Sequence, residues 1–169
     1  MPSQDKTKRL APLALLAAAA FVLSWVDSLI PVSGALPGAK LGLANLSVLI
    51  GLYLLGPLPG AALCGLKILL QTFLFGNAYA FFYSLAGGIL SYLVMLLTRK
   101  RCSVMFVSAL GGVFHNLGQV LVAAVILQTA GLMAYFPVLM LCGIGAGLAV
   151  GLAGGILISR LRPILPFIS

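Results

Sequence analysis

The chain alternates long apolar stretches with short interruptions that contain Pro, Gly or clustered basic residues. Such interruptions are typical of turns between helices. Six apolar stretches are candidates for helices in a membrane. They cover residues of about 10–30, 41–55, 61–75, 79–98, 104–127 and 132–159. The pattern therefore predicts an all-α integral membrane protein, a six-transmembrane-helix bundle forming a single transmembrane domain over residues 1–169.

The second and third stretches are separated only by the sequence Gly-Pro-Leu-Pro-Gly at residues 56–60. Each piece has about 15 residues, whereas a straight span needs ~20. Two arrangements fit: a pair of short tilted helices, or a re-entrant hairpin that lines a cavity. Both return the chain to the side it came from, so the remaining topology is the same in either.

Composition excludes a soluble globule, because 62% of the residues are hydrophobic and only 7% are charged. The net charge of +8 is not spread as a nucleic-acid surface would be, so no nucleic-acid partner is expected. Basic residues instead flank the apolar stretches, at 6–9, 99–101 and 160–162. This positive-inside pattern predicts that both termini are cytoplasmic, with residues 1–9 as a basic cytoplasmic N-terminus. A secretory signal peptide is the alternative for the first stretch, which is long for one.

The residue inventory also excludes several chemistries. Asp5 and Asp27 are the only carboxylates, which excludes a carboxylate-held Mg²⁺ cluster and paired-carboxylate catalysis. There is no phosphate-binding loop, so an ATP-driven step needs a partner. One His and three scattered Cys do not make a metal site. We therefore expect neither an enzyme nor an intrinsic cofactor or metal.

Small residues recur at helical spacing in two places. The first set predicts a close helix contact, either inside the bundle or with another subunit; it consists of Gly143, Gly147, Gly151 and Gly155. Ala14 and Ala18 form a second small face on the first helix.

Polar side chains at membrane depth are costly, so each needs a partner, a cavity or a function. The candidates for ligand binding are Asp27, Asn45, Lys67, Gln71, His115, Asn116 and Gln119. Lys67 and Gln71 are four residues apart, as are His115 and Gln119. Two polar stripes could therefore face each other across an interior site; alternatively, these groups bond to one another and hold the bundle together.

Three of these residues carry specific expectations. Lys67 would be a fixed cation for an anionic or carbonyl-bearing ligand, unless burial neutralises its amine. Asp27 would either balance Lys67 or pair with Lys40 at the outer surface. His115 could donate to a ligand carbonyl or relay a proton, because an imidazole ordinarily titrates near neutral pH.

Four motifs occur in order along the chain: Lys-Leu-Gly-Leu-Ala-Asn at 40–45, Phe-Gly-Asn at 75–77, Ser-Leu-Ala-Gly-Gly at 84–88 and His-Asn-Leu-Gly-Gln at 115–119. Together they resemble the bacterial heptaprenyl diphosphate synthase component I family, also called the Gx transporter family. That family is similar to the S components of energy-coupling-factor (ECF) transporters, six-helix proteins that bind a vitamin-like ligand from outside and dock on an ATPase module. The resemblance implies an S-component-like fold in the bacterial cell membrane, with Ala14 and Ala18 as the docking face.

Three functions follow from the residues and the resemblance together. The first is a ligand-binding transport subunit for a small lipophilic molecule related to quinones or isoprenoids, with an ECF ATPase module as partner. The second is a quinone-linked subunit that holds a bound quinone and passes electrons to an extracytoplasmic flavoprotein. The third is a non-catalytic accessory component of heptaprenyl diphosphate synthesis, for the menaquinone side chain.

Overall fold

The computed structural model describes residues 2–29, 42–75 and 78–164. Within these ranges the chain forms α-helices and short 3₁₀-helices, with no strand. The α-helices are α1 (Pro2–Leu29), α2 (Asn45–Leu54), α3 (Pro57–Phe75), α4 (Ala78–Thr98), α5 (Val104–Ile126) and α6 (Phe136–Leu161). The 3₁₀-helices η2 (Ala130–Tyr135) and η3 (Arg162–Ile164) flank α6. The predicted all-α class is confirmed.

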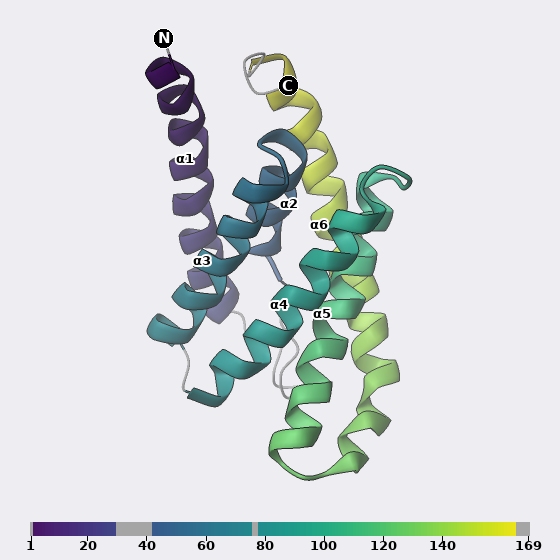
Figure 1. Ribbon diagram of the computed structural model, residues 1–169. Coiled ribbons are helices and arrows are strands. Elements are labelled where there is room, and N and C mark those ends of the chain that lie inside the picture. Colours follow the sequence, from purple (N-terminus) through teal and green to yellow (C-terminus); the bar gives the residue numbers. More distant parts are fainter. Residues whose placement is uncertain (1, 30–41, 76–77, 165–169) are drawn as a thin grey trace.

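The ends of the helices gather at two ends of the bundle (Figure 1). The start of α1, the turn between α2 and α3, residues 99–103 and the end of α6 lie at one end. The end of α3, the start of α4 and residues 127–131 lie at the other. The basic residues at 99–101 and 160–162 therefore share an end with the N-terminus, as the positive-inside pattern requires.

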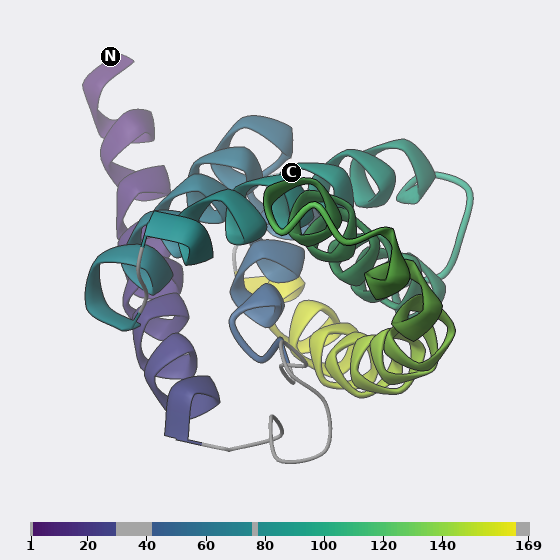
Figure 2. The ribbon, with the colours of Figure 1, turned by 90° about the horizontal axis from the view of Figure 1, so that it is seen from below.

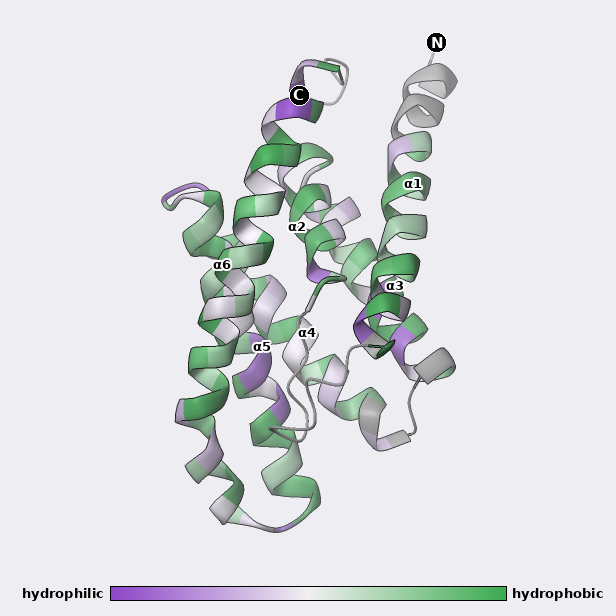
Figure 3. Cartoon of the chain, turned by 180° about the vertical axis from the view of Figure 1, so that it is seen from behind, coloured by the Kyte–Doolittle hydropathy of each residue, from purple (hydrophilic) through white to green (hydrophobic). Residues whose placement is uncertain are grey.

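Four helices of the described chain contain segments long and apolar enough to cross a membrane. The segments are Leu10–Asp27, Phe81–Thr98, Val104–Ile126 and Ala130–Ile164. Large apolar side chains such as Leu15 (72% exposed), Phe73 and Val125 point outward, which suits a lipid surround and not water. Figure 3 shows the hydrophobic colouring along most of the helices, with hydrophilic positions on α3 and α5 at mid-height. These features indicate an integral membrane protein.

Helices α2 and α3 are not among these four segments, and α2 is the shorter of the two. It has 10 residues and so a length of about 15 Å, half the thickness of a bilayer's hydrocarbon core. A helix of this length is compatible with both arrangements that the sequence leaves open for 41–55, a short tilted helix and one arm of a re-entrant hairpin. Helix α2 ends where Gly56 takes a positive φ of 103° and the N–H groups of Leu55 and Gly56 both donate to the carbonyl of Gly51.

Helix α3 starts at Pro57, four residues before the predicted start at 61. Both prolines of the 56–60 sequence thus lie in its first turn, where the missing N–H of a proline costs no helical hydrogen bond. Two further predicted boundaries differ. Helix α1 begins at Pro2 instead of residue 10, and α6 begins at Phe136 instead of residue 132 because the 3₁₀-helix η2 precedes it.

The helices pack as two groups of three. Helices α1, α2 and α3 contact one another, α5 packs against both α4 and α6, and the groups meet where α3 touches α4 and where α2 touches α6. Seen along the bundle, α2 lies in the middle (Figure 2). Its residues from Ser47 to Leu52 are all buried, as expected of an apolar helix surrounded by others.

Glycines set the contact between α5 and α6. A Cβ added at Gly143, Gly147 or Gly151 would lie 2.6–2.8 Å from the backbone of α5, closer than real Cβ atoms approach. Gly155 differs from the predicted pattern, because nothing lies within 4 Å of its Cβ position. Its neighbour Gly154 faces the bundle instead, against Leu49 of α2. The stripe therefore turns away from α5 after three glycines.

We expect Gly147→Ala to lower the free energy of unfolding by about 1–3 kcal/mol, because its Cβ would press on the carbonyl of Ser108, 2.6 Å away. The matched control is Gly145→Ala on the same helix, where the Cβ meets open space. That variant should be neutral or more stable, by up to roughly 1 kcal/mol, since Ala is the better helix former. Unfolding in detergent measures both, and equal effects would contradict the close contact.

Candidate functional site

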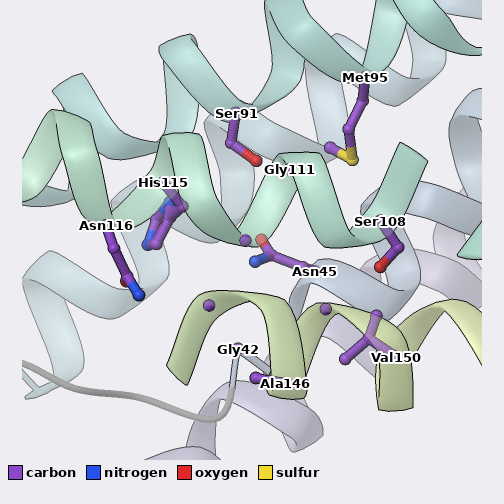
Figure 4. Close-up of a pocket in the computed structure, with 13 residues that line it drawn as sticks. Gly42, Asn45, Ser91, Met95, Ser108, Gly111, His115, Asn116, Ala146 and Val150 are labelled. Carbon is purple, nitrogen blue, oxygen red and sulfur yellow. The ribbon is translucent and has the colours of Figure 1, made fainter. Parts of the chain in front are cut away.

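A small cavity lies where the start of α2 meets α4, α5 and α6 (Figure 4). Its volume is about 30 Å³, which is room for about two water molecules. Polar side chains and glycines from four elements line it. The lining residues are Gly42, Asn45, Ser91, Met95, Ser108, Gly111, Gly112, His115, Asn116, Gly143, Ala146, Gly147 and Val150.

Asn45 is the first residue of α2 and joins the cavity to Lys67 of α3. The Lys67 Nζ donates to Asn45 Oδ1 at 2.5 Å, a short, charge-assisted bond. Lys67 is 2% exposed, so its stem and amine are enclosed by the bundle. Because the amide oxygen of Asn45 accepts the hydrogen bond from Lys67, its amide nitrogen Nδ2 remains as a donor on the side of the cavity.

Two residues of α5 supply further polar atoms. Asn116 is buried, and its Nδ2 donates to the carbonyl of Leu139 at 2.7 Å, which ties α5 to α6. His115 Nε2 lies 3.3 Å from Nε2 of Gln119, one turn further along the same helix. His115 also packs on α4, since a Cβ at Gly87 would lie 3.0 Å from its Nδ1.

The seven predicted ligand-binding residues do not all surround one space. Asn45, His115 and Asn116 line the cavity, whereas Asp27, Lys67, Gln71 and Gln119 do not. Lys67 reaches it through Asn45, Gln71 is buried on α3 one turn beyond Lys67, and Asp27 is buried on α1. Lys40, the predicted surface partner of Asp27, lies outside the described residues.

The predicted stripes do not face each other, because α4 lies between α3 and α5. Ile68, next to Lys67, packs on Gly88 of α4, and His115 packs on the adjacent Gly87. Helical spacing alone places residues on one face of a helix but does not say which neighbour that face meets. The expectation that the two polar stripes face each other across one site is therefore wrong. Among the first three helices, α2 and not α3 contributes a polar side chain to the cavity, that of Asn45.

Ser91 and Ser108 are the polar lining residues that the sequence did not single out. Ser91 is 2% exposed, and its Oγ has no hydrogen-bond partner in the described part of the chain. A small hydroxyl in an apolar helix is common, so nothing in the sequence marks these two. Their place in the fold does, because both reach the space that the glycines of α5 and α6 leave open (Figure 4).

Ala14 and Ala18, the predicted docking face, are exposed on α1. No helix in the described chain covers this face. No group of three or more His, Cys, Asp or Glu that could hold a metal ion occurs among the residues with defined positions.

The model of one protein family matches the chain over residues 16–157, which is most of its length. Its description is heptaprenyl diphosphate synthase component I. The chain belongs to this family. The resemblance predicted from the four motifs is thereby confirmed. No curated protein and no solved structure matches this family member, so the likeness to S components stays a prediction.

The bond between Asn45 and Lys67 predicts a measurable coupling. In a double-mutant cycle of Asn45→Leu and Lys67→Met, we expect a coupling of about 1–2 kcal/mol in the free energy of unfolding in detergent. The reason is that each single variant breaks the same hydrogen bond. A parallel cycle with Lys100→Met, an exposed lysine at the end of α4, should show no coupling to Asn45. Equal coupling in both cycles would contradict a direct bond.

Proposed function

We propose that this membrane protein is a ligand-binding transport subunit, built like an S component, for a small lipophilic molecule related to quinones or isoprenoids. The observation that carries the proposal is a helix that begins inside the bundle. The start of α2 lies at a cavity, and its first side chain bonds to a buried lysine. Broken helices with ends inside the membrane are a common way to build substrate sites in transporters.

The energetic cost of burying the polar groups near the cavity supports a functional role for them. In a bundle surrounded by lipid, a buried amine and a set of amide, hydroxyl and imidazole groups are expensive to keep. A purely structural bundle needs only contacts such as that of Asn116 with Leu139. Lys67, Ser91 and Ser108 are not needed for such contacts between helices. They lie near α2, the one helix of the described chain that is half as long as a span.

The size of the cavity implies movement. Sites for drug-sized ligands have volumes of about 300–1,000 Å³, against about 30 Å³ here. A quinone ring therefore enters only if the helices separate. The two groups of three helices meet at the α2–α6 and α3–α4 contacts, so we propose that ligand entry opens these contacts.

The positions of the two carboxylates support the proposal that the chain does not itself perform prenyl transfer. Asp5 and Asp27 are both in α1, 22 positions apart, which places their backbones roughly 33 Å apart along the helix. They cannot hold a shared Mg²⁺ ion within one chain. We therefore propose that the protein is not an enzyme and has no intrinsic cofactor, although a quinone can be its ligand.

We expect native mass spectrometry of the protein, purified from its own membrane, to find a bound organic molecule. Lys67→Met should lower its occupancy roughly tenfold or more, because the loss of a charged donor is worth about 1.5–3 kcal/mol. Lys100→Met, which removes an exposed lysine, should keep the wild-type occupancy. Equal occupancy in Lys67→Met and wild type, or no organic molecule in wild type, would overturn the proposal.

The partner can be tested through the open face of α1. If transport is driven by an ECF ATPase module, the module should co-purify with the protein, and Ala14→Leu with Ala18→Leu should abolish the association by filling the small face. Ala149→Leu, at an exposed small residue of α6, is the control and should leave it intact. Association that survives the double change would rule out this docking face.

The same purification tests the other functions. The family's description names a component of heptaprenyl diphosphate synthase, which favours an accessory role in that synthesis as the second candidate. Co-purification with a soluble prenyl diphosphate synthase in place of an ATPase would support it. Co-purification with an extracytoplasmic flavoprotein would support the quinone-linked alternative, in which His115 assists proton exchange.

A further inference from the structure

The electrostatics of the cavity favour a negative guest. The positive end of a helix dipole lies at the first residue of α2. The residue before it is Ala44, whose side chain makes no cap hydrogen bond; the N–H groups of Asn45 and Leu46 donate to the backbone carbonyls of Gly42 and Leu43. The amine of Lys67 adds a second positive group, one hydrogen bond away through Asn45. No carboxylate is among the described residues that line the cavity.

The donors are also in place. Ser91 points its hydroxyl toward the cavity (Figure 4), is 2% exposed and finds no partner in the described structure. Leaving a buried hydroxyl without a hydrogen bond is costly, so its position indicates that a guest accepts from it. The Nδ2 of Asn45, oriented by the lysine on its oxygen, is a second donor, and the hydroxyl of Ser108 lines the same space.

The volume limits the guest to a few atoms. About 30 Å³ holds about two water molecules. A halide ion is only slightly larger than one water, and a single charged oxygen of a larger molecule needs no more room. Adding bulk is not possible without moving a backbone, because Gly112 and Gly143 at the cavity wall already touch each other.

We propose that the cavity at the start of α2 binds one small anion, either a free halide or the charged oxygen of a ligand's head group. The case of a head group rests on the proposed function, whereas the free halide does not. In both cases Ser91 and Asn45 donate to the anion, and the positive end of α2 and Lys67 balance its charge.

Chloride is the probe for the free ion, and acetate stands in for a carboxylate head group. Purified protein is titrated with each salt against hexafluorophosphate, an anion that is larger than chloride and has no oxygen to enter the cavity, at constant ionic strength. Thermal unfolding followed by intrinsic fluorescence reports binding, because a ligand of the folded state raises Tm. We expect chloride to raise the Tm in a saturable manner. A rise with acetate as well identifies the head-group oxygen as a second source, and a rise with chloride alone identifies the free ion.

Ser91→Ala should weaken the apparent affinity about tenfold or more, since it removes a donor to a charged group. The matched control is Ser84→Ala, a buried serine of the same helix that does not line the cavity. In hexafluorophosphate, Ser91→Ala should unfold at the same temperature as wild type or higher, because it loses an unpartnered hydroxyl. The direction of this change in Tm separates an anion site from a structural role of Ser91.

No dependence of Tm on either anion would overturn the proposal and leave water as the partner of Ser91. An unchanged affinity in a folded Ser91→Ala variant would also overturn it. The proposed transport function fails differently, by absence of an organic molecule in the native mass spectrum. The two results can therefore be told apart.

Discussion

The structure depends on the absence of water as a hydrogen-bond partner inside a lipid-surrounded bundle. A helix that starts within such a bundle leaves N–H groups and a positive dipole end that the solvent cannot satisfy. Helix α2 begins inside the bundle, where the N–H groups of Asn45 and Leu46 donate to the carbonyls of Gly42 and Leu43, and the side chain of Asn45 accepts from the buried Lys67. The other end of α2 meets the same constraint, since Arg99 donates to the carbonyl of Leu52 at 3.0 Å. Both ends of the short helix are thus held by cationic side chains of neighbouring helices.

Close packing around this helix comes from glycines, because hydrocarbon provides little hydrophobic drive between helices. Gly112 and Gly143 bring α5 and α6 into backbone contact, and Gly87 and Gly118 do the same for α4 and α5. A small space remains beside the start of α2, where glycines of α5 and α6 line it. The cavity is a consequence of this packing, and the polar groups that line it come from four different elements.

The short helix α2 and the glycine packing around it connect the fold to the proposed roles. The two groups of three helices are joined mainly through α2 and α4, and the proposed entry of a ligand larger than the cavity would part them. A small anion would enter without such a movement and would balance the positive charge at the start of α2. An open face of small residues on α1 and membership in the heptaprenyl diphosphate synthase component I family are compatible with a partner protein, whose identity separates the transport and synthesis roles.

The sequence by itself determined the class of the protein, its helices and its family. Hydropathy and basic clusters depend on local composition, so they could be interpreted without neighbours, and the motifs from Lys40 to Gln119 carried the family resemblance. Helical spacing also placed Gly143 and Gly147 on one face. Only the tertiary structure decided that α2 spans half a membrane, that α4 separates Lys67 from His115, and that Ser91 reaches a cavity. The reason is that a face of a helix is a local property, whereas its partner depends on how the helices are arranged in space.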